Sequence, residues 1–191
     1  MKLIKGTILG LSILAVSFAN AQQKAKPLSM KNMLKVGISG GVAIPSENAS
    51  AAIGLDVAYQ NLITPGFGLG VATGYTHYFG KDNIGLNNND FGVIPLAAMF
   101  RYYPKNTGVY IGADLGYGFI VGSDYVASNF PLNKPDGGVY LKPEIGYHNN
   151  DWNLSIHYQK TFTDDKSDIG TQNYNAASLG FGVSYNIPLG K

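Results

Sequence analysis

Ser155 and His157 come closest to a hydrolytic pair in this 191-residue sequence, and Glu144 lies one segment earlier. A serine hydroxyl becomes a nucleophile when a histidine accepts its proton and a carboxylate orients that histidine. Residues two apart on a β-strand point to the same side, so an extended segment places Ser155 beside His157. That side faces the interior of the barrel predicted below, away from lipid, and chance is the better explanation of the spacing. We therefore expect no catalytic residues and no enzymatic activity.

Charged side chains form a second candidate group, because they fall on the same side of their segments as many small residues. An isolated buried charge is costly, and a buried charge that loses its partner strongly destabilises a fold. We expect these side chains to pair as a polar network that fills a narrow interior, with His148 as a weaker candidate member. The expected network consists of Asp56, Arg101, Asp114, Lys142, Glu144 and His157.

The sequence offers little to hold a metal ion or an organic cofactor. It has no cysteine to supply a thiolate ligand. The acidic loop 164–168 is followed by Ile169, where a calcium-binding loop needs glycine. The run Gly66-Phe67-Gly68 passes through a predicted strand and does not lead from a strand into a helix, as a phosphate-binding loop would. We expect no metal site and no cofactor.

Eight segments with a two-residue alternation must position the charged side chains. In the last of them, Leu179, Phe181 and Val183 alternate with small residues. Successive side chains of a strand point to opposite faces, so each segment has one apolar face and one small or polar face. The segment 91–103 is apolar on both sides, which leaves its parity open. The eight predicted strands are 34–44, 51–60, 66–79, 91–103, 107–121, 138–148, 151–162 and 174–187.

The connections between these segments alternate between short and mostly longer ones. Outer-membrane barrels have tight turns at the periplasmic rim and longer loops outside the cell. We therefore predict an all-β fold, an eight-stranded antiparallel up-and-down transmembrane β-barrel with both termini in the periplasm. The short connections lie near 61–65, 104–106 and 149–150, and the longer ones are 45–50, 80–90, 122–137 and 163–173.

Aromatic residues near the strand ends predict two girdles at the membrane interfaces. The alternative is a soluble lipocalin-type barrel, whose apolar faces point inward around a ligand. The second faces, which are rich in glycine, serine and asparagine, are too small and polar for the exterior of a soluble barrel, and this favours the membrane version. The expected girdles are Tyr59, Phe67, Tyr102, Tyr147, Trp152 and Tyr185 at the periplasmic rim, and Tyr75, Phe79, Phe91, Phe119, Tyr158 and Phe162 at the other.

The first 21 residues have the pattern of a secretory signal peptide. A basic start is followed by an apolar run from Ile8 to Phe18 and by the small residues Ala19-Asn20-Ala21, after which we expect cleavage. We divide the chain into this signal, 1–21, a short periplasmic segment, 22–33, and a barrel domain, 34–191. The chain has 14 basic and 12 acidic residues, and the signal carries two of the lysines, so the mature part has no net charge. This balance argues against nucleic acid as a partner.

Several runs in the predicted strands have a family-like pattern: Val36-Gly37-Ile38-Ser39-Gly40-Gly41, Ile94-Pro95-Leu96, Phe100-Arg101-Tyr102-Tyr103-Pro104 and Gly180-Phe181-Gly182-Val183-Ser184-Tyr185. In these runs, and over nearly the whole mature chain, the sequence resembles the outer membrane protein β-barrel domain family, the small OmpA/OmpX-like proteins of Gram-negative bacteria. The resemblance implies fold and location more than activity.

The expected function is that of a non-enzymatic outer-membrane protein that contributes to envelope structure or surface interaction through four extracellular loops. Weak permeation is a secondary expectation, because eight strands enclose an interior just wide enough for side chains to fill it. The expected partners are lipopolysaccharide and phospholipid, and the barrel-assembly machinery during insertion, with the protein itself a monomer. The alternatives are a lipid A-modifying barrel enzyme, which needs Ser155, His157 and Glu144 to converge, and the soluble barrel.

Overall fold

The computed structural model describes residues 31–163 and 167–190 of the chain. The predicted signal peptide, 1–21, lies outside the described residues. So do most of the predicted periplasmic segment 22–33 and residues 164–166 of the acidic loop.

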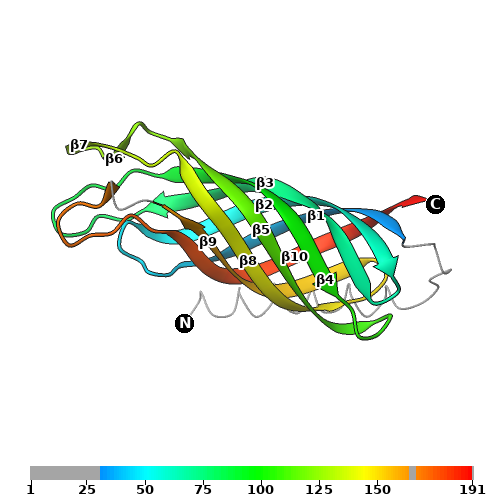
Figure 1. Ribbon diagram of the computed structural model, residues 1–191. Coiled ribbons are helices and arrows are strands. Elements are labelled where there is room, and N and C mark those ends of the chain that lie inside the picture. The colour runs from blue at the N-terminus through cyan, green and yellow to red at the C-terminus, as the bar shows by residue number, and fades with distance from the viewer. Residues whose placement is uncertain (1–30, 164–166, 191) are drawn as a thin grey trace, which may run out of the picture.

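Eight long antiparallel strands form one closed barrel, in which they follow the order β1-β10-β9-β8-β5-β4-β3-β2 (Figure 1). The barrel closes where β1 pairs with β10, and every other neighbouring pair consists of barrel strands consecutive in the chain. The predicted fold class is therefore confirmed. The barrel strands are β1 (Asn32–Ala43), β2 (Ala49–Thr64), β3 (Phe67–Gly80), β4 (Phe91–Tyr102), β5 (Gly108–Gly122), β8 (Gly137–His148), β9 (Trp152–Phe162) and β10 (Ala176–Gly190).

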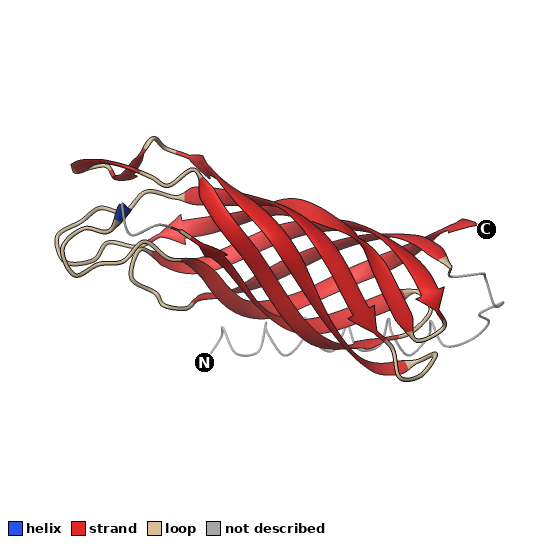
Figure 2. Ribbon diagram, viewed as in Figure 1, coloured by secondary structure: helices blue, strands red, loops and turns tan. Residues whose placement is uncertain are grey.

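A small hairpin that the sequence did not predict stands in the connection between β5 and β8. It consists of β6 (Tyr125–Ala127) and β7 (Phe130–Asn133), which pair only with each other among the named strands. Figure 2 shows strands throughout the barrel wall and irregular loops mainly at one end. No helix in the described part of the chain is long and apolar enough to cross a membrane.

The two ends of the barrel differ in their connections. The short-turn end carries the links 65–66, 103–107 and 149–151, together with the first residue of β1 and the last of β10. The loop end carries the links 44–48, 81–90, 123–136 and 163–175. The first loop, 44–48, is no longer than the turn 103–107, so the contrast in length rests on the other three loops.

Large apolar side chains cover the outside of the barrel. On β4, whose parity the sequence left open, Leu96 and Phe100 are exposed while Met99 and Arg101 are buried, so β4 follows the same rule as its neighbours. The apolar exterior is the reverse of the arrangement in a soluble ligand-binding barrel. One expected member of the exterior girdle is wrong: Phe91 is 4% exposed and lies inside the barrel, because its β4 parity points it inward with Met99.

Close contact between strands depends on glycine in several places. A Cβ atom added to Gly70 of β3 would lie 1.8 Å from the carbonyl oxygen of Tyr59 on β2. At Gly40, on the exterior of β1, the nearest such contact is 3.7 Å, to the carbonyl oxygen of Ala52. The tight approach at Gly70 belongs to an inward-facing position, and it lets the wall curve around the narrow interior.

Candidate functional site

The interior of the barrel carries ion pairs at its centre. Arg101 of β4 donates through Nη1 to Oδ1 of Asp114 on β5 at 2.6 Å, and its Nε lies 2.8 Å from Oε1 of Glu144 on β8. All three side chains are at most 7% exposed. One guanidinium therefore bridges two buried carboxylates, a geometry for which its planar array of donors is well suited.

A second ion pair crosses the barrel. Nζ of Lys142 on β8 lies 2.8 Å from Oδ1 of Asp56 on β2, and β8 and β2 are four places apart in the ring of eight strands. The Asp56 side chain is 32% exposed and borders a cavity of about 60 Å³. The cavity is also lined by Ser155 and Ser184. A polar cavity of this size has room for a few water molecules but none for a solute of any size. Asp56, Arg101, Asp114, Lys142 and Glu144 are called the central network below.

Lys35 of β1 is a third interior cation, and the sequence reasoning missed it. It is 7% exposed, and its Nζ donates to the hydroxyl of Tyr103 at 2.8 Å. The Tyr103 hydroxyl in turn donates to Oε1 of Gln60 at 2.8 Å. Lys35 has the same parity as Gly37 and Ser39, so the alternation that revealed the other charges was a signal that could have found it. With Lys35, the buried charges described in the lumen are three Lys or Arg side chains and three Asp or Glu side chains.

Aromatic rings and a histidine fill the lumen near the short-turn end. His148 packs against Tyr103, with ring centroids 4.6 Å apart, and lies edge-on to Tyr110. One nitrogen of His148, Nε2, hydrogen-bonds to the carbonyl oxygen of Lys105 at 3.1 Å. His148 is therefore inside the barrel and helps to fill this end. Among the described residues, no hydrogen bond or ion pair joins it to the central network.

Ser155, His157 and Glu144 do not form a hydrolytic site. Glu144 and His157 are cross-strand neighbours, but the carboxylate of Glu144 is engaged by Arg101. His157 is 3% exposed, and its Nδ1 has no hydrogen-bond partner within the described residues. Both Ser155 and His157 face the closed lumen. A lipid at the outer surface of the barrel could not reach them.

A polar layer lies between the central network and the loop end. The side-chain nitrogen of Gln159 donates to Ser178 at 3.1 Å and to Tyr78 at 3.3 Å, and its Oε1 accepts from the hydroxyl of Tyr140 at 3.3 Å. Gln159 is 2% exposed. We call these residues, with Thr76, the glutamine layer. The small pocket that Thr76, Gln159 and Ser178 border has no room for a water molecule.

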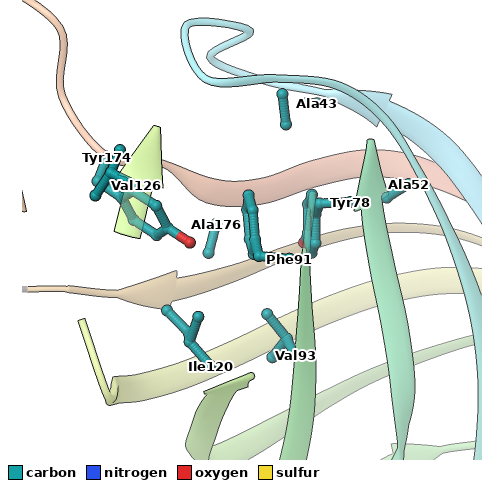
Figure 3. Packing of buried hydrophobic residues seen from close by; sticks show 10 residues of the cluster. Ala43, Ala52, Tyr78, Phe91, Val93, Ile120, Val126, Tyr174 and Ala176 are labelled. Atoms are coloured by element: carbon teal, nitrogen blue, oxygen red, sulfur yellow. The ribbon is translucent and has the colours of Figure 1, made fainter. Parts of the chain in front are cut away.

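An apolar cluster closes the lumen at the loop end (Figure 3). Tyr78 and Phe91 stack with centroids 4.8 Å apart and ring planes 4° apart, and Tyr174 lies 5.1 Å from Phe91. Tyr174 comes from a loop and not from the barrel wall, and burial raises the pKa of its phenol. The loop-end cluster consists of Ala43, Ala49, Ala52, Tyr78, Phe91, Val93, Ile120, Val126, Tyr174 and Ala176.

Hydrogen bonds join the loops above this cluster. Asn88 of the loop 81–90 and Gln172 of the loop 163–175 exchange side-chain amide hydrogen bonds at 2.8 and 3.3 Å. The hairpin β6–β7 is tied to the loop 81–90 through Asn129, whose amide accepts from the backbone of Asn87 at 2.9 Å and donates to the carbonyl of Gly85 at 2.8 Å. The described parts of these loops thus form one connected layer across the mouth.

No family model and no curated protein matches this sequence. Among solved structures, the outer membrane protein OprG from Pseudomonas aeruginosa is similar, with a TM-score of 0.54 and 14% identity over 82% of this chain and 96% of OprG. The fold is that of an outer-membrane barrel. Two further outer-membrane barrels were matched over 82% of this chain. Ail from Yersinia pestis has a TM-score of 0.49 and 15% identity over 98% of its chain, and Neisserial surface protein A has 0.46 and 17% over 97%.

Proposed function

We propose that this protein is an integral outer-membrane barrel without enzymatic activity, which acts at the cell surface through its loops. The observation that carries the proposal is the reversed polarity of the barrel. Phe181 and Ile38 on the outside are 70% and 66% exposed, while Arg101 and Asp114 inside are 6% and 4% exposed. Exterior apolar side chains gain stabilisation only against lipid, and interior charges are stable only when paired. The loop end then faces the outside of the cell and the short-turn end faces the periplasm.

The lumen does not favour transport in this proposal. The central cavity of about 60 Å³ is bounded toward the loop end first by the glutamine layer and then by the loop-end cluster. Toward the periplasm, Tyr103, Tyr110 and His148 fill the space. The layer of connected loops remains available to a partner. Exposed loop residues on a rigid scaffold often form binding sites. Lipopolysaccharide and phospholipid around the wall, the barrel-assembly machinery during insertion and a monomeric state belong to the same proposal.

Membrane fractionation tests the location. We expect the protein in the outer-membrane fraction, with a gel band that migrates differently before and after boiling. We also expect protease added to intact cells to cut within the loop 123–136, which carries the exposed residues Tyr125 and Phe130. Recovery as a soluble periplasmic protein would overturn the proposal.

Planar-bilayer recordings test the closed lumen. We expect no resolvable conductance from the folded protein. Stable channel openings would instead support the permeation function and would contradict the proposal that the protein acts mainly through its loops.

A further inference from the structure

Tyr174, like Val126 of the hairpin strand β6, belongs to the loop-end cluster but not to the barrel wall, and its side chain can leave the cluster without breaking a strand. The stacked pair Tyr78 and Phe91 sits on β3 and β4, and both residues take part in cross-strand pairing. Tyr174 precedes β10, and the contacts that hold its ring are packing contacts, chiefly against Phe91. Figure 3 shows the ring extending from its loop into the mouth, with Phe91 and Tyr78 beyond it.

The polar bonds near Tyr174 anchor the backbone of its loop and not its ring. Its amide nitrogen donates to Oδ1 of Asp168 at 2.8 Å, and its carbonyl oxygen accepts from the hydroxyl of Thr163 at 3.2 Å. The amide pair between Gln172 and Asn88 fixes the loop to its neighbour across the mouth. These bonds set where the ring enters the barrel. Within the described residues, no hydrogen bond holds the Tyr174 side chain itself.

The closed arrangement leaves polar atoms without partners. Within the described part of the chain, the Tyr174 hydroxyl, Oγ1 of Thr161 and Nδ2 of Asn48 accept or donate no hydrogen bond. Their residues are 6%, 2% and 1% exposed. A buried polar group without a partner loses the hydrogen bonds that water would supply. The unpartnered hydroxyl therefore favours states in which water enters the mouth, and it opposes the packing of the ring.

Thr161 faces the lumen at the same end of the barrel as the Tyr174 ring. It pairs in register with Ala176 of the loop-end cluster, and its Oγ1 lies near Val93, another member. The glutamine layer comes next along the lumen, and it is held by hydrogen bonds among wall residues only. An opening at Tyr174 therefore exposes Thr161 and stops at Gln159.

We propose that the Tyr174 side chain is a movable door over the outer mouth, which opens a shallow polar-floored cup to the outside while the glutamine layer keeps the deeper lumen closed. The amide pair between Asn88 and Gln172 holds the door shut from above. Whatever binds the outer loops and changes that pair will also change access to the cup. The proposal concerns the loop end of the folded barrel and holds whether or not the loops act in surface interaction.

Thiol labelling of the full chain in phospholipid nanodiscs tests the door, since the protein has no cysteine of its own and a single introduced thiol is the only one present. Thr161→Cys reports on the cup and Ser155→Cys on the central cavity. Thr171→Cys, at an exposed position in the same loop, measures the unhindered rate of a small methanethiosulfonate reagent. We expect Thr161→Cys to react at least tenfold more slowly than Thr171→Cys.

The substitutions at Tyr174 form a matched pair. Tyr174→Ala removes the door, and we expect it to raise the labelling rate of Thr161→Cys at least tenfold and to leave that of Ser155→Cys unchanged. Tyr174→Phe keeps the ring and removes the unpartnered hydroxyl, and we expect it to slow the labelling of Thr161→Cys below the rate with the native tyrosine. Gln172→Ala removes the amide pair with Asn88. We expect it to raise the labelling rate of Thr161→Cys while Tyr174 remains intact.

Three results would overturn the proposal. One is an unchanged rate at Thr161→Cys in both Tyr174→Ala and Gln172→Ala. Another is faster labelling in Tyr174→Phe than with tyrosine. The third is an equal acceleration at Ser155→Cys, which would show that the glutamine layer is no barrier. Heat-modifiable gel migration identifies variants that have folded, and if Tyr174→Ala fails this check, Gln172→Ala and Tyr174→Phe decide the outcome.

Discussion

At the scale of single residues, the two ion pairs of the central network differ in how much they should contribute to stability. Removal of Arg101 takes away the salt-bridge partner of two buried carboxylates, Asp114 and Glu144. Removal of Lys142 leaves Asp56, which is 32% exposed to the central cavity and can keep part of its hydration. Burial, and not the number of ion pairs, should therefore rank the two substitutions.

We expect Arg101→Leu to lower the free energy of unfolding by about 3–5 kcal/mol, because it strands two buried charges. We expect Lys142→Met to lower the free energy of unfolding by a smaller amount. Urea-induced unfolding in lipid vesicles measures both losses.

The triple variant Arg101→Leu, Asp114→Asn, Glu144→Gln is the matched control, since it removes the charges together. It should recover most of the lost stability. A triple variant as unstable as Arg101→Leu alone would show that the loss comes from packing around the guanidinium and not from unpaired charge.

At the scale of elements, strand spacing depends on where a Cβ atom can fit. Gly70→Val would place its Cβ against the carbonyl oxygen of Tyr59, and we expect a loss of about 1–3 kcal/mol or failure to close the barrel. Gly40→Val is the matched control on the exterior of β1, where the Cβ meets only ordinary contact. Equal stability of the two variants, measured by the same unfolding experiment, would contradict the close approach of β2 and β3.

The alternation of apolar and small side chains was enough to predict most of the fold, because the eight predicted segments coincide with the eight barrel strands to within a few residues. It also predicted the inward faces for the five members of the central network, because charged and small side chains alternate with apolar ones on β2, β4, β5 and β8. The hairpin β6–β7 was not predicted, because its strands have only three and four residues and Pro131 interrupts the second. The door could not be predicted, because the position of Tyr174 depends on contacts between loops that are far apart in the chain.

At the scale of the whole molecule, the apolar exterior makes stability depend on depth in the bilayer. Leu115 lies midway along β5 and is 52% exposed, whereas Ile63 lies at the short-turn end of β2 and is 58% exposed. We expect Leu115→Arg to cost about 2–4 kcal/mol and Ile63→Arg about 0–1 kcal/mol in lipid vesicles. Similar small costs at both positions would mean that no bilayer surrounds the barrel.

The Lys142–Asp56 ion pair has a consequence for assembly. Its two members come from β8 and β2, which are sequence-distant strands on opposite sides of the ring. A sheet that is still open, or one in which a strand is missing or misplaced, cannot bring them within 2.8 Å of each other. The pair thus favours correct closure, because only the complete ring brings Lys142 and Asp56 together. An incomplete ring keeps the energetic cost of these two unpaired charges.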